Sequence, residues 1–170
     1  VMGNLGLSPI CVAQFPDYML LKILANWRAS AARAGFATDG ATIPVSLKCY
    51  IGDTDEAART EAKKYLPQFY ALQAEHYTVD STPWKDIAGY EQFAKIFANM
   101  KQMADPEKIG PILERNLVGS PQTVARQINN LRSLGFNYFI ISNATAGVPL
   151  EVRQRMMRLF MNDVAPIVRA

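Results

Sequence analysis

Few residues in this chain could perform acid–base, nucleophilic or metal chemistry. His76 is the one histidine, and Cys11 and Cys49, both in apolar surroundings, are the two cysteines. A Ser-His-Asp triad would have to use His76, and nothing like a nucleophile elbow accompanies it. A zinc site built on histidine and cysteine would need a cluster that the chain does not have, so we expect no metal site.

Glycine-rich phosphate loops of the Walker or dinucleotide-binding type are also missing from the sequence. If the chain belongs to an enzyme, we therefore expect a cofactor to carry the chemistry. We also expect the groups that hold the phosphate of such a cofactor to lie elsewhere.

Residues 44–52, PVSLKCYIG, place a lysine and a tyrosine on one face of a predicted strand. Period-two alternation separates an apolar set from a second set formed by Ser46, Lys48 and Tyr50. A lysine on an inward face needs a partner or a polar pocket. A shift of one residue in register would instead place Lys48 on the outside.

Three predicted strands, residues 1–8, 44–52 and 137–142, alternate with helices along the chain. This order indicates an α/β fold with a parallel sheet. We expect the helices to cover only the outer face of that sheet. The first helix is predicted from a cap at Asp17 to about residue 34, with one apolar face formed by Leu20, Leu24, Trp27 and Ala31.

The second helix is predicted from a cap at Asp53 or Thr54 to about residue 77, with Pro67 kinking or splitting it. Ser120 caps the helix that follows the long middle segment, and Gly135 ends that helix. The run NYFIIS is typical of a strand covered on both faces. An amphipathic helix ends the chain.

Residues 78–116 interrupt this order with three prolines, short helical patches and no predicted strand. A segment of this length between regular units is usually a lid or a binding loop. Lys85, Tyr90 and Lys101 are the side chains in it that could act on a substrate, although each is also an ordinary loop or helix residue.

Composition limits the function further. The 170 residues are 49% hydrophobic and carry a net charge of +3, with basic residues scattered among acids. A nucleic-acid groove would concentrate its positive charge, so we expect no nucleic-acid partner. No apolar run approaches the ~20 residues that span a bilayer, and two cysteines are expected to be reduced thiols in a cytoplasmic protein.

Three ordered stretches resemble the bacterial luciferase-like flavin-dependent monooxygenases. They are GNLGLS, IGDTDEAARTEAKKYL, and VGSPQTVARQINNLRSLGFNYFIIS with the terminal VRQRMMRLFMNDVAPIVR. The resemblance covers the whole chain, loosely over residues 78–116 and most specifically over 117–168. No single motif is diagnostic, but the ordered set of three makes the resemblance fairly strong.

The resemblance implies a TIM (β/α)8 barrel, of which this chain would form strands six to eight. Residues 1–170 would then be a single partial barrel domain with a possible active-site lid at 78–116. Val1 would stand inside strand six. A complete barrel needs ~250 residues.

Barrel enzymes hold their chemistry at the carboxyl ends of the strands. On the resemblance, Gly6, Leu7 and Ser8 would contact the cofactor, and Gly6 would let a flat ring approach the backbone. Further residues are expected to line the substrate pocket or lid, namely Lys48, Tyr50, Lys85, Tyr90, Ser142 and Asn143.

The implied activity is oxygenation of a small organic substrate with reduced FMN and O2. Two alternatives stay open: an oxidoreductase of the same superfamily that uses the deazaflavin F420, and a non-catalytic flavin-binding or scaffold relative. The expected protein partner is the missing N-terminal part of the barrel or another copy of the chain, as in a homo-oligomer.

Overall fold

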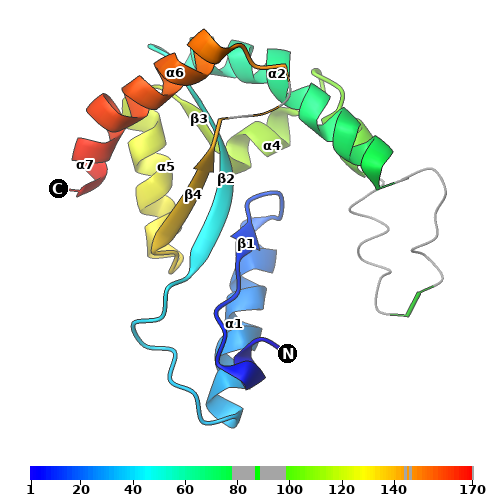
Figure 1. The fold of residues 1–170 in the computed structure, drawn as a ribbon, viewed down its shortest axis with the longest axis vertical. Coiled ribbons are helices and arrows are strands. Elements are labelled where there is room, and N and C mark those ends of the chain that lie inside the picture. The colour runs from blue at the N-terminus through cyan, green and yellow to red at the C-terminus, as the bar shows by residue number, and fades with distance from the viewer. Residues whose placement is uncertain (78–86, 89–98, 144, 146, 170) are drawn as a thin grey trace.

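The computed structural model describes residues 1–77, 87–88, 99–143, 145 and 147–169, and Figure 1 shows their arrangement. Within these residues, four parallel strands form one sheet with β2 at its centre. The strands are β1 (Cys11–Val12), β2 (Pro44–Ile51), β3 (Leu117–Gly119) and β4 (Tyr138–Ser142). The prediction of an α/β fold with a parallel sheet is confirmed.

The central strand β2 pairs with three strands although a strand has only two edges. The Ala13 N–H donates to the Ser46 carbonyl at 3.0 Å, and the Gly52 N–H donates to the Gly119 carbonyl at 3.3 Å. Every second residue of a strand directs its backbone groups to the same edge. Because Ser46 and Gly52 are an even number of residues apart, β1 and β3 follow one another along one edge of β2, and β4 occupies the other.

Asn116 fills the gap between β1 and β3 on that shared edge. Its side-chain oxygen accepts the Lys48 N–H at 2.8 Å, and its amide donates to the Ile112 carbonyl at 2.8 Å. A buried backbone N–H without a partner is costly. The buried Asn116 therefore replaces a strand partner at the one place along this edge that neither β1 nor β3 reaches.

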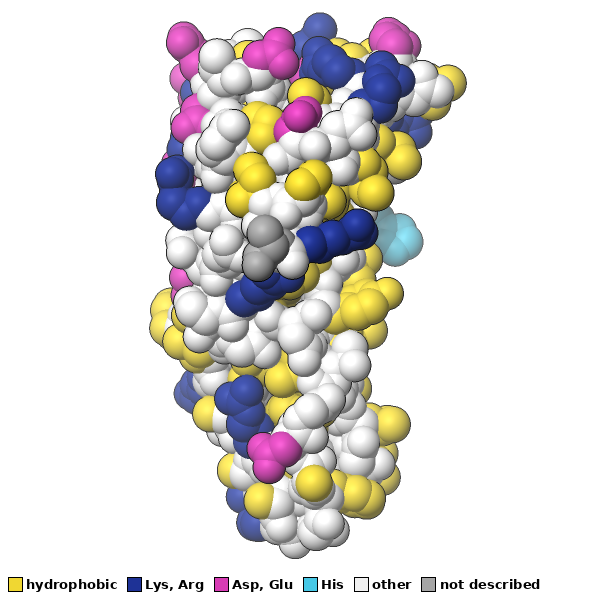
Figure 2. Space-filling view, turned by 90° about the vertical axis from the view of Figure 1, so that its left-hand side faces the viewer, with side chains coloured by type: hydrophobic (Ala, Val, Ile, Leu, Met, Phe, Trp, Pro, Cys, Tyr) yellow, Lys and Arg dark blue, Asp and Glu magenta, His cyan; other side chains and the backbone are white. Residues whose placement is uncertain are grey.

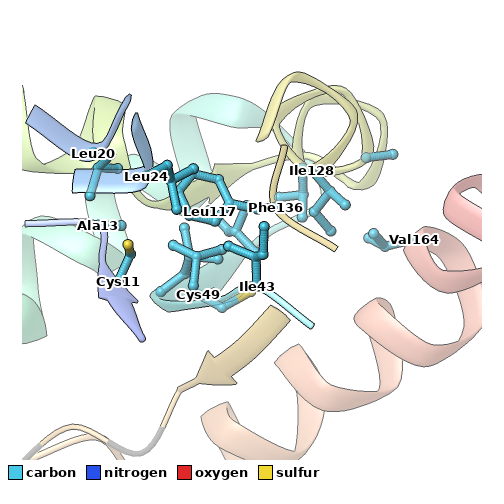
Figure 3. Packing of buried hydrophobic residues seen from close by; sticks show 14 of the residues in the cluster. Cys11, Ala13, Leu20, Leu24, Ile43, Cys49, Leu117, Ile128, Phe136 and Val164 are labelled. Carbon is cyan, nitrogen blue, oxygen red and sulfur yellow. The ribbon is translucent and has the colours of Figure 1, made fainter. Parts of the chain in front are cut away.

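Two helices, α1 (Asp17–Arg33) and α5 (Pro121–Ser133), bury one face of the sheet. Val45, Leu47, Cys49 and Ile51 of β2 pack there against apolar side chains of both helices, as predicted. Figure 3 shows Leu20 and Leu24 of α1 and Ile128 of α5 around this core. The predicted cap at Asp17 is wrong by one residue, because Pro16 occupies the cap position.

The opposite face is also covered at its carboxyl end, so the prediction of helices on one face only is wrong. The helices α2 (Asp55–His76), α4 (Gly110–Arg115) and α6 (Leu150–Leu159) bury Tyr50, whose side chain lies opposite Cys49 and Ile51. Figure 1 shows α2 and α6 across the ends of the strands. After α6 the chain continues as a π-helical turn, Phe160–Val164, and α7 (Ala165–Arg169).

Pro67 lies inside α2 without dividing it. Thr54 caps this helix, as one of the two predicted caps, and its hydroxyl accepts the Ala57 N–H. The helix then runs unbroken to His76. Only the bond from residue 67 back to Lys63 is lost, because proline lacks the N–H. Pro67 and Leu66 are both buried on the packed side of this helix.

The predicted strand at residues 1–8 is wrong. Gly3–Leu5 form a short 3-10 helix, and Gly6 ends it with φ of 69°. A Cβ on Gly3 would lie 2.5 Å from the Trp27 carbonyl oxygen, so this glycine lets the segment pack directly on α1. Contact with α1 therefore replaces strand pairing, and β1 begins only at Cys11.

The sequence interpretation also missed β3, whose three residues directly precede the helix cap at Ser120. The predicted insertion at residues 78–116 is described only in part. Its described portion contains helical residues 99–103 and the helix α4.

One face of β4 is open, which corrects the prediction that this strand is covered on both faces. Tyr138 and Ile140 are 56% and 39% exposed, whereas Phe139 and Ile141 pack against the core. Val12 of β1 lies on the same open face and is 37% exposed. An apolar face of this kind is typical of a surface that another element covers.

Charged side chains are dispersed on the face shown in Figure 2, where Lys and Arg alternate with acidic and apolar groups. No basic groove of the kind that binds nucleic acid is visible there. None of the helices formed by the described residues has the length and apolar character needed to cross a membrane.

Candidate functional site

The carboxyl ends of β2 and β4 bring four of the predicted pocket residues together. Lys48 is paired with Ser142 in the ladder, so the two side chains lie on the same face of neighbouring strands. Tyr50 follows two residues after Lys48, and Asn143 follows Ser142 directly. This clustering arises because parallel strands end at the same edge of a sheet.

Tyr50 is completely buried and is joined to the loop after β4. Its hydroxyl shares a hydrogen bond of 2.6 Å with the Thr145 hydroxyl. Burial raises the pKa of Tyr50 to about 12, although the hydrogen bond to Thr145 acts in the opposite direction. Tyr50 is therefore a neutral phenol at physiological pH, and it fixes the loop against the end of β2.

Lys48 lies beside an aromatic ring of α2. Its Nζ is 3.8 Å from the centroid of the Phe69 ring, and burial lowers the pKa of the lysine. A cation over a ring face is attracted by the ring quadrupole. No ion pair to Lys48 occurs in the part of the chain that the structure describes. The ammonium group is thus a partly desolvated cation that an anionic or carbonyl oxygen could approach.

Asn143 already has a structural contact. Its side-chain amide donates to the Arg153 carbonyl at 3.0 Å, which ties the end of β4 to α6. The side-chain oxygen of Asn143 is left as the group that could accept a hydrogen bond from a ligand.

Gly6, Leu7 and Ser8 are not brought to these residues. They precede β1, and the Leu7 carbonyl accepts a hydrogen bond from Trp27 Nε1 at 2.8 Å in the second half of α1. Gly6 faces the Phe36 ring just beyond that helix. The segment therefore lies toward the amino ends of the strands, because α1 runs antiparallel to them. The role of this segment in cofactor binding stays a prediction, because the segment does not lie beside the carboxyl ends of the strands.

The predicted lid residues Lys85 and Tyr90 lie outside the described residues. Lys101 is described and exposed in the helical residues 99–103. Among described residues, no group of three or more His, Cys, Asp or Glu side chains is placed to hold a metal ion. His76 ends α2, and its ring stacks edge-on against Tyr77.

Sequence reasoning missed Thr145 and Tyr70. The Tyr70 hydroxyl is buried and has no hydrogen-bond partner among the described residues. Burial raises the pKa of Tyr70, the nearby Tyr50 raises it further, and the charge of Arg115 lowers it. The four-residue spacing of Ala58, Ala62, Leu66 and Tyr70 could have shown that Tyr70 is buried, but no sequence signal points to Thr145.

Asp55 links the beginnings of α2 and α5 at this end of the sheet. Its carboxylate accepts the Ser120 N–H at 2.7 Å and the Thr123 hydroxyl at 3.0 Å. These hydrogen bonds lower the pKa of Asp55. The contact spans 65 residues of sequence, which is why the sequence alone did not indicate it.

Replacing Asp55 with alanine is expected to lower the free energy of unfolding by about 1 kcal/mol at pH 7, a value kept small because the carboxylate is exposed. The pKa of the Asp55 carboxyl is lower in the folded protein than in the unfolded chain. The stabilisation is therefore fully present at pH values above the unfolded-chain pKa, near 4, and it disappears as the pH falls through the folded-state pKa.

Urea denaturation at pH 7 and at acidic pH measures this difference. Asp53→Ala removes the same charge at an exposed loop position with no hydrogen bond to α5 among the described residues, and it should have little effect. A loss for Asp55→Ala that stays constant down to pH 2 would contradict the assignment.

Two hollows border this end of the molecule. One, of about 570 Å³, lies at the start of α2 and is lined by charged groups including Asp53, Glu56, Glu61, Lys64 and Arg155. Glu61 and Arg155 already form an ion pair there. The other, of about 580 Å³, lies between the start of α1 and α4 and has aromatic and cationic walls.

A comparison with models of protein families finds a match. The model of the luciferase-like monooxygenases matches residues 1–138. Residues 139–168, which carry part of the sequence resemblance, lie beyond this match. No curated protein matches the chain.

Solved structures share the fold. The monooxygenase RslO1 of Streptomyces bottropensis aligns with a TM-score of 0.61 and 21% identity over 96% of this chain. A second structure is the oxygenating part of 3,6-diketocamphane monooxygenase of Pseudomonas putida, a type II Baeyer-Villiger enzyme in complex with FMN. It aligns with a TM-score of 0.61 and 23% identity over 96% of this chain. Riboflavin lyase, with modified FMN and riboflavin, aligns with a TM-score of 0.64 and 20% identity over 95% of this chain.

This chain is much shorter than those proteins. It spans 43%, 44% and 38% of their lengths, in the same order. At these identities the likeness shows a common fold and leaves activity and substrate open.

Proposed function

The chain belongs to the luciferase-like monooxygenase family, and we propose that it is part of an enzyme that oxygenates a small organic substrate with reduced FMN and O2. The observation that carries the proposal is the gathering of Lys48, Tyr50, Ser142 and Asn143 at the carboxyl ends of β2 and β4. In parallel α/β folds, this is where ligands bind.

We further propose that residues 1–170 are one partial barrel domain, corresponding to strands six to eight. The open face formed by Val12, Tyr138 and Ile140 supports this, since the inner faces of a complete barrel pack against each other. The remaining barrel units, or a second copy of the chain in a homo-oligomer, would cover that face. The free thiols of Cys11 and Cys49 agree with the cytoplasmic location that we propose.

The described residues fit the ring of a flavin better than its phosphate. The side chain of Ile140 is partly exposed and lies two residues before Ser142 on the same face of β4, and Lys48 and Ser142 continue that face with polar groups. A flat ring with one apolar surface and a polar edge matches that combination. Beyond these residues, Gly6, Leu7 and Ser8 remain sequence-based candidates for cofactor contact.

Reduced FMN, when bound, would supply the electrons for the reaction with O2. Lys48 would hold a positive charge beside the ring or the substrate, where burial strengthens its electrostatic effect. Tyr50, held by Thr145, would keep the loop after β4 in place. Residues 78–116, with Lys85 and Tyr90, remain the candidate lid on sequence grounds, and such a lid would exclude water.

A flavin titration tests this proposal. The isolated chain should bind FMN weakly, because the groups that hold the phosphate and one wall of the ring site are missing. The same chain joined to the upstream barrel units should bind FMN tightly, as followed by quenching of flavin fluorescence. Lys48→Met should weaken that binding about tenfold, as expected for loss of a partly buried cation. Lys63→Met, an exposed position on α2, should not.

Parallel titrations with the deazaflavin F420 separate the alternative cofactor from FMN. Micromolar binding of FMN by an isolated chain that light scattering shows to be monomeric would contradict the partial-barrel proposal. If the chain joined to the upstream barrel units binds neither FMN nor F420, the result favours the alternative of a non-catalytic scaffold relative.

A further inference from the structure

The hollow between α1 and α4 has the size of a small-molecule site. Its volume of about 580 Å³ lies in the range of ligand pockets. Phe15, Met19, Ile23 and Met103 provide apolar and aromatic surface. Gln14, Phe15 and Pro16 of its wall follow β1 (Cys11–Val12) in the chain, and Lys48, Tyr50, Ser142 and Asn143 do not line it.

The charged groups that line this hollow are both positive. They are Lys22 on α1 and Arg115 at the end of α4, and no Asp or Glu side chain is part of its described wall. Asp17 is near in sequence, but it is exposed and does not line the hollow. Among the described residues, the lining thus combines an apolar surface with two positive side chains and no acidic one.

Arg115 retains free hydrogen-bonding capacity. Among the described residues it makes one hydrogen bond, from Nη1 to the Gln14 carbonyl at 3.3 Å, and Gln14 is also part of the lining. A guanidinium group carries five N–H donors in a fixed planar arrangement. The remaining donors can therefore bind both oxygens of a planar anionic group such as a carboxylate.

The start of α1 adds to this positive potential. The 17-residue helix begins after Pro16, which provides no side-chain cap, and Asp17 is an acid in its first turn. The Met19 and Leu20 N–H groups bond to the Pro16 carbonyl, so among the described residues the N–H groups of Asp17 and Tyr18 are the ones left without a cap. Pro16, Tyr18 and Met19 all line the hollow. Unpaired N–H groups and the helix dipole favour an anion at this end.

From this combination we infer that the hollow between α1 and α4 binds a small organic anion with a flat apolar body and a carboxylate group. The anionic group lies against Arg115, with Lys22 closing the outer side, and the apolar body packs on Phe15, Met19 and Met103. The inference concerns residues outside the proposed flavin site and does not depend on flavin binding.

Calorimetric titration of the 170-residue chain with 1-naphthoate tests the inference. Naphthalenemethanol, a neutral compound with the same ring, serves as the comparison ligand. We expect the naphthoate to bind at least about tenfold more tightly than the alcohol, and to lose affinity as salt is added, because two cations hold the anionic group.

Variants locate the binding. Arg115→Gln should weaken naphthoate binding about tenfold, and Lys22→Gln, an exposed change that leaves the packing intact, about threefold. Lys108→Gln removes an exposed cation that pairs with Asp105 outside the hollow, and it should bind like the parent chain. Lys48→Met should also have no effect, so this result and the flavin result are independent.

Equal affinity for naphthoate and the alcohol would overturn the inference. So would equal naphthoate affinity in the parent chain, Lys22→Gln and Arg115→Gln, each shown to be folded by circular dichroism.

Discussion

Replacing Leu24 with alanine is expected to lower the free energy of unfolding by about 3 kcal/mol. Leu24 of α1 has no exposed surface and packs in the core between the helix and β2. Truncation to alanine removes buried apolar surface and leaves a cavity that the surrounding strand and helices can only partly fill. Urea denaturation followed by circular dichroism measures this loss.

Leu21 offers a matched control one turn away on the same helix. It is 42% exposed, and Leu21→Ala deletes the same atoms from a position in contact with water. The expected loss is about 0.5 kcal/mol or less, as for most surface substitutions. Similar losses for the two variants would mean that α1 does not bury the face assigned to it.

Replacing Gly52 with alanine is expected to cost about 2 kcal/mol through overpacking. A Cβ at this position would lie 2.8 Å from the Ala58 backbone nitrogen and 3.2 Å from the Ala57 Cβ, both in the first turns of α2. Backbone cannot move aside as a flexible side chain can. The strain would also reach the Gly52 N–H, whose bond to the Gly119 carbonyl joins β2 to β3.

Gly110→Ala is the control for this substitution. A Cβ at Gly110 would meet no atom within 4 Å, and alanine favours the helix that begins there. The variant should be unchanged or more stable by up to about 1 kcal/mol. Thermal unfolding of the two variants gives the comparison, and equal melting temperatures would contradict the close approach of α2 to β2.

Lys48 shows which part of the candidate site the sequence predicts and which part depends on the tertiary structure. Alternation in residues 44–51 placed it on the face opposite Val45 and Leu47, and the structure agrees. Alternation carries no information about what covers that face. The Phe69 ring beside the ammonium group comes from α2, which was expected on the other side of the sheet.

The sequence by itself determined those helices and strands that are encoded by residues close together in the chain. Apolar spacing defined α1, Thr54 and Ser120 marked the starts of α2 and α5, and period two defined β2. Each of these rests on side chains within about one turn or one strand of each other, where propensity and capping act.

The tertiary structure alone decided the features that depend on contacts between distant residues. Residues 1–8 have strand-like composition, but packing of Gly3 on α1 competes successfully with pairing. Asn116 completes the edge of β2, Thr145 binds Tyr50, and Asp55 binds the start of α5, across 65 to 95 residues. Such contacts form only after the chain has brought these segments together, so no local pattern can encode them.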